Sequence, residues 1–396
     1  MILIVTSRYP FGSQESYLGT ELAELTRHFA RIAVAPVRSP GSAAARQLPD
    51  GVELVALPLL GGDVLLRAVR AFAAAPRRAL GTLAELARSR DPGRVKNLAV
   101  ALKGLALAQW AREHGVSHVH AYWVSTPATV AMIAAKVSGA SWSATAHRWD
   151  IYERNAFDVK ARSAAFVRAI SRRGAEDVAA RMPGVAGRVV QLRLGAVVPE
   201  IALPVPAADA FRIVCPAALV PVKGHADLFA ALALLRARGV PVRCTLAGTG
   251  PLRRELELLA ARLRIDDAVA FAGFVPQQTL HAWYRAGRFA AVVLASRASG
   301  AREMEGVPSA LIEAMALGVP VVATDSGSVG ELVDASCGLL VAPGDPDALA
   351  RALREVAEDP ERARERARRA HRTVAERHDV CTQMVALAAA LRKAGA

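Results

Sequence analysis

The chain has 396 residues, 53% of them hydrophobic, and its formal net charge at pH 7 is +14. This length predicts two or three domains. The chain holds no apolar run of the roughly 18 residues that a membrane-spanning helix needs. The N-terminal MILIVTSRYP lacks the basic region and cleavage site of a signal peptide. We therefore expect a cytoplasmic protein, and peripheral contact with the inner face of the membrane stays open.

The basic charge is unevenly distributed along the chain. Residues 1–200 hold 26 Lys/Arg and 15 Asp/Glu, whereas residues 201–396 hold 24 and 21. Nucleic acid, an anionic membrane face and a phosphorylated substrate would each suit such a surface, and an ordinary solvated basic surface explains it equally well. The four cysteines show no CxxC spacing, which favours reduced thiols over disulfides or a zinc site.

Strands and helices alternate in the first half. The predicted strands are MILIVTS, RIAVAPV, VELVALP, VSHVHAYW and SWSATAH. The predicted helices cover 19–29, 62–90, 93–114 and 126–139, because apolar residues recur there at helical spacing. The first of these helices, for example, places Leu22, Leu25 and Phe29 on one face.

A proline-rich stretch over 196–211 predicts an interdomain linker, and a second alternating series follows it. Its predicted helices cover 225–238, 251–263, 277–286 and 308–317, and its strands cover 241–247, 268–273, 289–295 and 319–323. Strands separated by such helices form parallel sheets with right-handed crossovers. We predict an α/β protein of two doubly wound, Rossmann-like domains that face each other across a cleft, the default place for an active site.

The bounds we expect are 1–200 for an N-terminal acceptor-binding domain and 207–375 for a C-terminal donor-binding domain. The C-terminal helix, 376–396, should join the first domain.

The segment EGVPSALIEAMALGVPVVATDSGSVGELV, residues 305–333, carries the strongest chemical signal. Gly306 allows a tight turn, and Pro308 and Ser309 suit the start of a helix. Free N–H groups and the positive dipole end attract phosphate there. Glu305 precedes the helix, and Glu313 lies about one and a half turns inside it, where a carboxylate can accept hydrogen bonds from a ribose.

A second glycine-rich turn, from Asp325 to Gly330, follows the next predicted strand, and Glu331 is expected to open another helix. Two such strand-end loops suit a sugar attached to a diphosphate. The plain alternative is that Glu305 and Glu313 are surface charges, but it does not predict the loop–helix–strand–loop–helix context around them.

This segment resembles the EX7E motif region of family 4 retaining glycosyltransferases of the GT-B fold, a group that serves bacterial polysaccharide and natural-product synthesis. Four further stretches resemble the same family. LVPVKGHADLFAAL resembles its Lys-Gly segment, CTLAGTGPLRRELE its GxGPLR segment, VAFAGFVPQQTLHAWYRAG its nucleobase-pocket segment, and ATAHRWDIY its N-domain histidine loop. The similarity covers most of the second half and pieces of the first.

The resemblance implies roles for individual residues. Lys223 would bind the donor diphosphate and stabilise the leaving nucleotide, Glu313 would bind the ribose, and Glu305 would orient the donor sugar. His147 would sit near the reacting sugar. His147, Glu305 and Lys223 are thus the implied catalytic group. The implied donor-binding residues are Gly12, Asp150, Gly248, Gly250, Gly306, Val307, Pro308, Ser309, Glu313 and Glu331.

The chain departs from the family where an arginine often precedes the Lys-Gly turn, because that position is Ala218. Either Arg297 or Arg302 replaces that charge, or donor binding differs. A smaller departure is Ala295–Ser296, where the family often has Pro-Ser.

The activity implied is transfer of a sugar, with retention, from a nucleotide diphosphate sugar to a hydroxyl group. A UDP-sugar is favoured and a GDP-sugar comes next. We expect no required cofactor and no metal, since a helix N-terminus and cations balance the diphosphate. Attack by the acceptor on the same face, with the departing phosphate as base, is the expected mechanism.

The acceptor is expected on the first domain, as a saccharide, a lipid-linked saccharide or a small natural-product scaffold. Residues 62–112 combine leucines with arginines and could rest on anionic lipid, although two ordinary helices packed on the sheet explain them as well. A non-hydrolysing sugar-nucleotide epimerase and a non-enzymatic binder of anionic polymers are the competing hypotheses. We expect no specific nucleic-acid partner.

Overall fold

A computed structural model describes residues 1–12, 15–38, 47–200, 211–298 and 304–396. The chain divides into two compact units. Unit 1 comprises 1–195 and 380–396, and unit 2 comprises 196–379. The bounds expected from the sequence were 1–200 with 376–396, and 207–375; the acceptor and donor roles attached to them stay predictions.

Unit 1 is built on a seven-stranded sheet with the order β3-β2-β1-β4-β5-β6-β7, in which every neighbouring pair is parallel. The strands are β1 (Ile2–Thr6), β2 (Ile32–Pro36), β3 (Val52–Leu54), β4 (His118–Ala121), β5 (Ser141–Ala146), β6 (Val167–Ala169) and β7 (Val189–Gln191).

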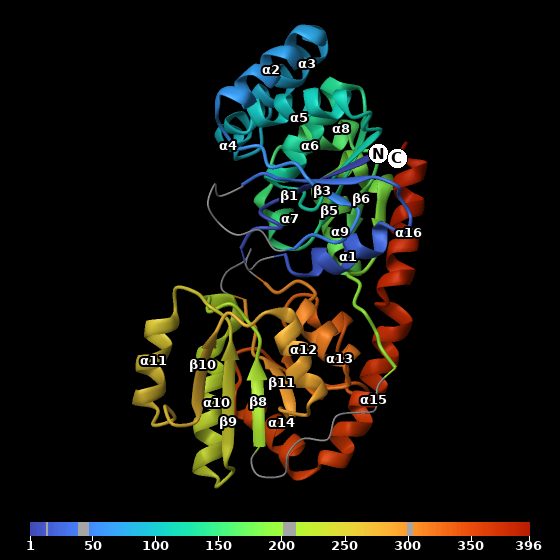
Figure 1. Ribbon diagram of the computed structural model, residues 1–396. Helices are drawn as coiled ribbons and strands as arrows, with labels where there is room; N and C mark the ends of the chain where they lie inside the picture. Colours follow the sequence, from blue (N-terminus) through green and yellow to red (C-terminus); the bar gives the residue numbers. More distant parts are fainter. Residues whose placement is uncertain (13–14, 39–46, 201–210, 299–303) are drawn as a thin grey trace. The chain divides into compact units, whose positions relative to one another are not determined.

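Helices cover both faces of this sheet, because successive strand residues point to opposite sides. Ile2 and Ile4 pack with α1 (Tyr17–Leu25) and α16 (Val380–Lys393). Leu3 and Val5 belong to the core that includes α5 (Ala101–Glu113) and α6 (Thr126–Ser138). Figure 1 shows α16 running along unit 1, where the chain ends. The shorter helices of unit 1 are α7 (Trp149–Glu153), α8 (Phe157–Ser163), α9 (Arg172–Arg181) and the 3-10 helix η1 (Pro183–Arg188).

The two long helices expected over 62–90 and 93–114 are each broken in the structure, so that prediction was wrong. Four helices replace them: α2 (Gly62–Ala74), α3 (Pro76–Ala87), α4 (Arg94–Ala99) and α5 (Ala101–Glu113). Pro76 lacks an N–H and restricts the residue before it, which explains the first break. Val100, with φ −95° and ψ 1°, separates α4 from α5.

Unit 2 has a six-stranded parallel sheet of order β10-β9-β8-β11-β12-β13. Its strands are β8 (Phe211–Cys215), β9 (Val242–Ala247), β10 (Val269–Gly273), β11 (Ala291–Leu294), β12 (Val321–Thr324) and β13 (Leu339–Val341). Its helices are α10 (His225–Ala237), α11 (Arg253–Arg262), α12 (Gln277–Arg285), α13 (Ser309–Ala316), α14 (Pro346–Glu358) and α15 (Pro360–Arg377). Two short 3-10 helices, η2 (Pro221–Lys223) and η3 (Val329–Glu331), lie in its loops.

Both sheets are doubly wound, as the sequence predicted. In each, the order reverses beside the first strand, between β1 and β4 and between β8 and β11. Ligands of open α/β sheets bind outside the carboxyl ends of the strands at such switch points. The loops after these four strands are therefore where functional side chains are expected.

Glu331 does not open a regular α-helix as expected; it ends the three-residue η3. Cys215, Cys244 and Cys337 are buried free thiols, and Cys381 is free and exposed. None of the helices in the described part of the chain is both long and apolar enough to cross a membrane.

Candidate functional site

The switch point of unit 2 holds a short ion pair. Lys223 ends η2 in the loop after β8, and its Nζ lies 2.5 Å from Oε2 of Glu305. Ser296, in the loop after β11, donates its hydroxyl to the same oxygen at 2.8 Å. The two charged side chains are largely buried, with 20% of the lysine and 12% of the glutamate exposed. A cation partly shielded from water is well placed to meet a phosphate.

The loop that carries Lys223 approaches its neighbour too closely for any side chain at Gly224. A Cβ there would lie 1.9 Å from the carbonyl oxygen of Ala295, and Gly224 has a φ of +61°. The backbone N–H of Arg297 donates to the carbonyl of Val222 at 2.9 Å, which ties the two switch-point loops together. These contacts fix the position of the lysine relative to Ser296 and Glu305.

The segment 305–309 leads into α13, as the sequence predicted. Val307 is buried, Pro308 precedes the first helical residue, and Ser309 is that residue. The amides at this end of α13 have no intrahelical partner and can face an anion. The loop after β12 packs on the same segment, since the N–H of Ser328 donates to the carbonyl of Glu305 at 3.3 Å.

Glu313 occupies the second turn of α13 and contacts a residue that sequence reasoning missed. Its Oε2 lies 2.9 Å from Nε2 of His281, which belongs to α12. Both side chains are mostly buried. His281 lies inside the stretch that resembles the nucleobase-pocket segment, but no spacing signal singles it out, because its meeting with Glu313 depends on how α12 packs against α13.

Gly248 and Gly250 have a packing reason to be glycine. A Cβ at Gly248 would lie 1.9 Å from the carbonyl oxygen of Ala217, and one at Gly250 would lie 2.4 Å from that of Leu219. The loop after β9 thus rests directly on the loop after β8. The implied role of the two glycines in binding the donor stays a prediction. The close packing of the two loops explains by itself why both positions are glycine.

Of the two candidates to replace the arginine absent at Ala218, only Arg297 lies within the described residues. Its Nη1 is 3.4 Å from Oδ1 of Asp227 on α10, and its backbone is joined to the loop after β8. Arg302 lies outside the described residues. His225, next along from Gly224, is buried with neither ring nitrogen hydrogen-bonded in the part of the chain that the structure describes.

Burial, and then the charge of Lys223, lower the pKa of His225 to about 4, so its ring is neutral near pH 7. A neutral imidazole adds no charge to the diphosphate half of the site. Sequence reasoning did not single out this histidine.

In unit 1, His147 follows β5, and its backbone N–H donates to Oδ1 of Asp150 at 3.0 Å. The second carboxylate oxygen of Asp150 accepts from the N–H of Val124 at 3.0 Å. The ring of His147 stacks on Trp123 with centroids 4.1 Å apart, and its Nε2 lies 2.8 Å from the hydroxyl of Tyr17. Asp150 therefore holds the histidine loop and is buried beneath it.

Burial determines the charge of these groups. It lowers the pKa of His147 to about 3 and raises the pKa of Asp150 to about 6, the latter against the opposing effect of its backbone hydrogen bonds. His147 is therefore neutral near pH 7. Its Nδ1 is buried and has no hydrogen-bond partner among the described residues.

The switch point of unit 1 is organised by Glu15, which sequence reasoning missed. Its carboxylate accepts hydrogen bonds from the backbone N–H groups of Ser7, Arg8 and Tyr9 at 3.1, 2.8 and 2.8 Å, and from Nε1 of Trp123 at 2.5 Å. Gly12, with a φ of +76°, lies in the same loop after β1. A lone acid in a polar loop carries no sequence pattern that would have predicted these contacts.

The structure thus brings Lys223 and Glu305 together, and Glu305 lies just before the start of α13. It also pairs Glu313 with His281. Glu331 lies in the loop after β12, in the same unit. His147, Asp150 and Gly12 belong to unit 1. Their functional roles stay predictions.

The match to a protein-family model lies within unit 2. Residues 205–373 match the family model Glycosyl transferases group 1. The chain is 39% identical over 123 residues to the putative colanic acid biosynthesis glycosyltransferase WcaL of Salmonella typhimurium, a match that covers 31% of this chain and 30% of that protein.

A GDP-mannose-dependent alpha-(1-6)-phosphatidylinositol monomannoside mannosyltransferase of Mycolicibacterium smegmatis is 35% identical over 152 residues, which are 38% of this chain and 40% of that protein. The match thus spans well under half the length of either curated relative.

Solved structures resemble the chain over almost its whole length. Anabaena Alr3699/HepE in complex with UDP-glucose has a TM-score of 0.72 at 20% identity and covers 99% of this chain and 100% of that one. Sucrose-phosphate synthase from Thermosynechococcus elongatus has a TM-score of 0.74 at 18% identity, with 99% and 98% covered. The predicted GT-B fold, as an architecture of two doubly wound α/β units, is confirmed.

Proposed function

We propose that this protein is a retaining glycosyltransferase of family 4 that moves a sugar from a nucleotide diphosphate sugar to a hydroxyl group of a saccharide, a lipid-linked saccharide or a small natural-product acceptor. The observation that carries the proposal is the pair of Lys223 and Glu305, whose charged atoms lie 2.5 Å apart at the switch point of unit 2. The match of 205–373 to Glycosyl transferases group 1 supports it.

In the proposed complex, the diphosphate lies against Lys223 and the free amides at the start of α13. Its charge competes with Glu305 for the ammonium, which frees the carboxylate to accept hydrogen bonds from the donor sugar. The lysine then stabilises the negative charge that builds on the departing phosphate. Glu313 accepts hydrogen bonds from the ribose, and His281 holds it in place at 2.9 Å.

The proposed reaction keeps the configuration of the sugar because the acceptor hydroxyl attacks from the face that the phosphate leaves. The acceptor bond to the anomeric carbon forms as the bond to the diphosphate oxygen breaks, and the hydroxyl proton passes to that oxygen. His147, neutral near pH 7, positions the sugar rather than taking a charge. The protein acts by orientation and by charge stabilisation, and we propose that it needs no metal or cofactor.

The two groups of similar proteins bear different donor names. The Anabaena structure is a complex with UDP-glucose, and the mycobacterial relative is called GDP-mannose-dependent. We favour a UDP-sugar and place a GDP-sugar second. A saccharide or lipid-linked acceptor is consistent with the names of the curated relatives, which mention colanic acid biosynthesis, amylovoran biosynthesis and phosphatidylinositol monomannoside.

A donor-turnover assay tests the proposal without knowledge of the acceptor. The protein is incubated with UDP-glucose and with GDP-mannose, and release of UDP or GDP is followed with and without simple sugar alcohols as acceptors. We expect turnover with at least one donor, and NMR of the first product should show the anomer of the donor. Glu305→Gln should lose most of this turnover, and the matched surface change Glu257→Gln should keep it.

Three outcomes would overturn the proposal. Turnover of neither donor, an inverted anomer, or a Glu305→Gln protein as active as the wild type would each do so. Interconversion of the donor into its epimer, without release of nucleotide, would establish the epimerase hypothesis instead.

A further inference from the structure

Exposed apolar side chains gather in one stretch of unit 1. Fourteen large apolar side chains among the described residues are exposed, and nine of them fall between residues 59 and 102. They are Leu59, Leu60, Leu65, Leu66, Val69, Leu80, Val95, Leu98 and Leu102. Single exposed apolar residues are normal, but a concentration of them indicates a surface that binds a partner.

Helix α2 is apolar on two opposite sides. Ala68 and Ala71 are buried where α2 packs on α5, and the sheet side of α5 is in turn covered by α6. Leu65, Leu66 and Val69 point away from that contact and are 55%, 50% and 56% exposed. Figure 1 shows α2 and α3 as the outer helices of unit 1, beyond α5. Packing within unit 1 explains the first side of α2 and leaves the second without a partner.

Helix α4 continues this pattern. Val95 is 81% exposed and Leu98 is 43% exposed, and Leu102 follows at the start of α5. The spacing of three residues places Val95 and Leu98 on one side of α4, and Leu102 belongs to the next helix, α5. Their outward side chains contribute little to the core of unit 1, so a role in folding does not account for them.

The same stretch is strongly basic. Residues 59–102 contain eight Lys/Arg and three Asp/Glu. The three acids have partners: Asp63 pairs with Arg67, Glu85 pairs with Lys136, and Asp91 accepts from the N–H of Phe157. By contrast, six exposed arginines have no carboxylate within ion-pair distance in the described part of the chain. They are Arg70, Arg77, Arg78, Arg88, Arg90 and Arg94.

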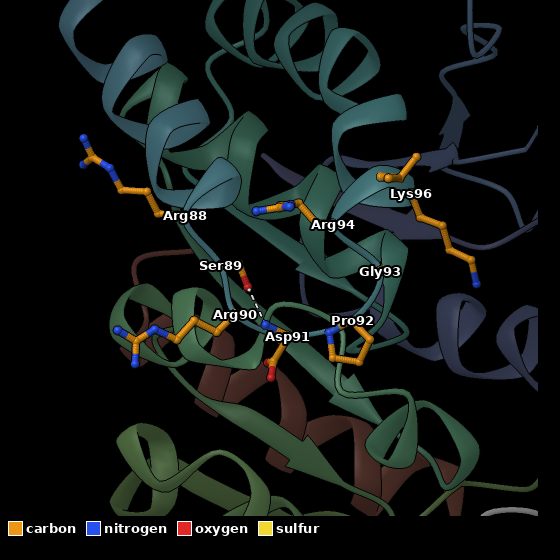
Figure 2. A pocket seen from close by; sticks show the side chains of 9 residues that line it. Arg88, Ser89, Arg90, Asp91, Pro92, Gly93, Arg94 and Lys96 are labelled. Carbon is orange, nitrogen blue, oxygen red and sulfur yellow. Dashed lines mark hydrogen bonds between the residues drawn. The ribbon is translucent and has the colours of Figure 1, made fainter.

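A basic hollow lies between α3 and α4. Residues 88–96 line an open cavity of about 640 Å³. Figure 2 shows Arg88 and Arg90 extending to one side of this loop and Lys96 to the other. The one acid of the loop, Asp91, is occupied by Phe157 and Arg154, at 2.6 and 3.2 Å. Positive charge therefore dominates the part of the hollow that faces water.

We propose that residues 59–102 form a docking surface for an anionic lipid bilayer. The apolar side chains of α2 and α4 enter the boundary between headgroups and acyl chains, and the arginines of α3 and of the loop 88–96 meet lipid phosphates. Helices with apolar residues on one side and arginines beside them bind membranes in this way, and juxtaposed cations add electrostatic attraction to anionic lipid.

Other partners fit the surface less well. A nucleic acid would match the arginines but leave Leu65, Leu66 and Val69 in water. A second copy of this chain would cover the leucines but would bring two arginine-rich stretches together, where their charges repel. Only an anionic bilayer offers apolar volume and negative charge side by side.

Vesicle co-sedimentation of the full chain tests the proposal. We expect binding to vesicles of phosphatidylcholine mixed with phosphatidylglycerol, little binding to phosphatidylcholine alone, and a loss of binding in high salt. The charge-reversal variant R77E/R88E/R90E should bind about 100-fold more weakly, because each arginine contributes its own attraction to the anionic lipid surface. The apolar variant L65S/L66S/V69S should bind about tenfold more weakly or worse.

Matched variants in unit 2 serve as controls. R351E/R368E/R372E reverses three exposed arginines, and L258S removes an exposed leucine; both should bind vesicles as the wild type does. All variants should keep the thermal shift given by UDP or GDP in the wild type. A separate assay of these nucleotides reports on the donor site, so failure of the docking surface and failure of the proposed function are distinguishable.

Several outcomes would overturn the proposal. The wild type could fail to bind anionic vesicles, or the unit 2 arginine control could lose as much binding as the unit 1 variant. Stabilisation by inorganic phosphate without vesicle binding would point to a soluble phosphate ligand. Self-association abolished by L65S/L66S/V69S, or salt-resistant binding of RNA, would each assign the surface to another partner.

Discussion

The switch points of the two sheets have the same topology and different chemistry. In unit 2, Lys223 after β8 and Ser296 after β11 both contact the carboxylate of Glu305. In unit 1, Trp123 after β4 and the backbone after β1 contact the carboxylate of Glu15. One carboxylate is held by a side-chain cation and a hydroxyl, and the other by backbone and indole N–H groups.

This difference indicates that the two switch points have different roles. A lysine can exchange its carboxylate for a phosphate, so the switch point of unit 2 can change partners when a ligand arrives. The N–H groups around Glu15 are already satisfied, and they shape the loop after β1. The adjoining His147 is uncharged near pH 7 because burial lowers its pKa to about 3. In the proposed function, unit 2 therefore contributes charge and unit 1 contributes uncharged groups.

Removal of the cation should have the largest effect. Lys223→Ala should lower the turnover of the nucleotide sugar about 100-fold to 1,000-fold, as for other preorganised groups that stabilise a developing negative charge. Lys223→Arg should recover part of the loss, because it keeps the charge. The control Arg238→Ala removes an exposed cation from the same unit. Equal turnover by Lys223→Ala and the control would refute a charge role for the lysine.

The buried histidines of unit 1 should make its stability depend on pH. Burial lowers the pKa of His118 to about 4, whereas an unfolded histidine titrates near 6.5. Between these values the unfolded state binds more protons, so the free energy of unfolding falls as pH decreases from 6.5 to 4. The contribution of His118 to this fall is about 3 kcal/mol.

Denaturant unfolding of the wild type and of His118→Asn across this range measures the effect. The variant should show a shallower fall, and above pH 7 the two proteins should differ by a constant amount. Asp150, whose pKa burial raises to about 6, contributes with the opposite sign, but it does so in both proteins and cancels. Parallel curves from pH 7 to 4 would show that His118 is not the group responsible.

Nucleotides with and without the ribose hydroxyl can distinguish a direct role of Glu313 in ribose binding from a general loss of structure in the variant. Loss of a charged hydrogen-bond acceptor should cost about 1.5–3 kcal/mol, so Glu313→Ala should weaken binding of UDP or GDP about 10-fold to 100-fold. Deoxyribose analogues of the nucleotide should bind the variant as well as the parent nucleotide does, while the wild type should prefer the ribose form. His281→Ala should show a weaker form of the same change. A variant that still discriminates the analogues would place the ribose elsewhere.

The smallest effect expected is that of His147, and it should be confined to catalysis. His147→Asn should lower kcat about tenfold through loss of positioning. It should leave the affinity for the free nucleotide unchanged, because we propose that unit 2 binds the nucleotide. Calorimetry and initial rates on the same sample separate the two. A large loss of nucleotide affinity would contradict the different roles of the two units.

The sequence predicted the doubly wound architecture because apolar strands and amphipathic helices alternate with regular spacing in both halves. It also predicted the neighbourhood of Glu305, Val307 and Ser309, since those residues are close along the chain. It did not predict the partnership of Lys223 with Glu305, which are 82 residues apart, and it missed Glu15 and His281. Contacts of that kind arise from the packing of distant elements and leave no local pattern.

Sequence reasoning also missed a break in a predicted helix. Residues 62–90 have a continuous helical period, yet Pro76 ends α2 and starts α3.

Gly248 and Gly250 were assigned to ligand binding, although the nearness of the carbonyls of Ala217 and Leu219 is itself enough to require glycine. A motif in the sequence shows that a residue type is needed and does not show which neighbour needs it.

The central claim, that unit 2 binds a nucleotide through its diphosphate, is tested most directly by calorimetric titration of UDP, GDP, UMP and GMP into the wild type and Lys223→Ala. We predict that at least one diphosphate binds the wild type more tightly than its monophosphate, and that Lys223→Ala removes this difference. If neither diphosphate binds, or if the monophosphate binds as tightly as the diphosphate in the wild type, the account of the donor site is wrong.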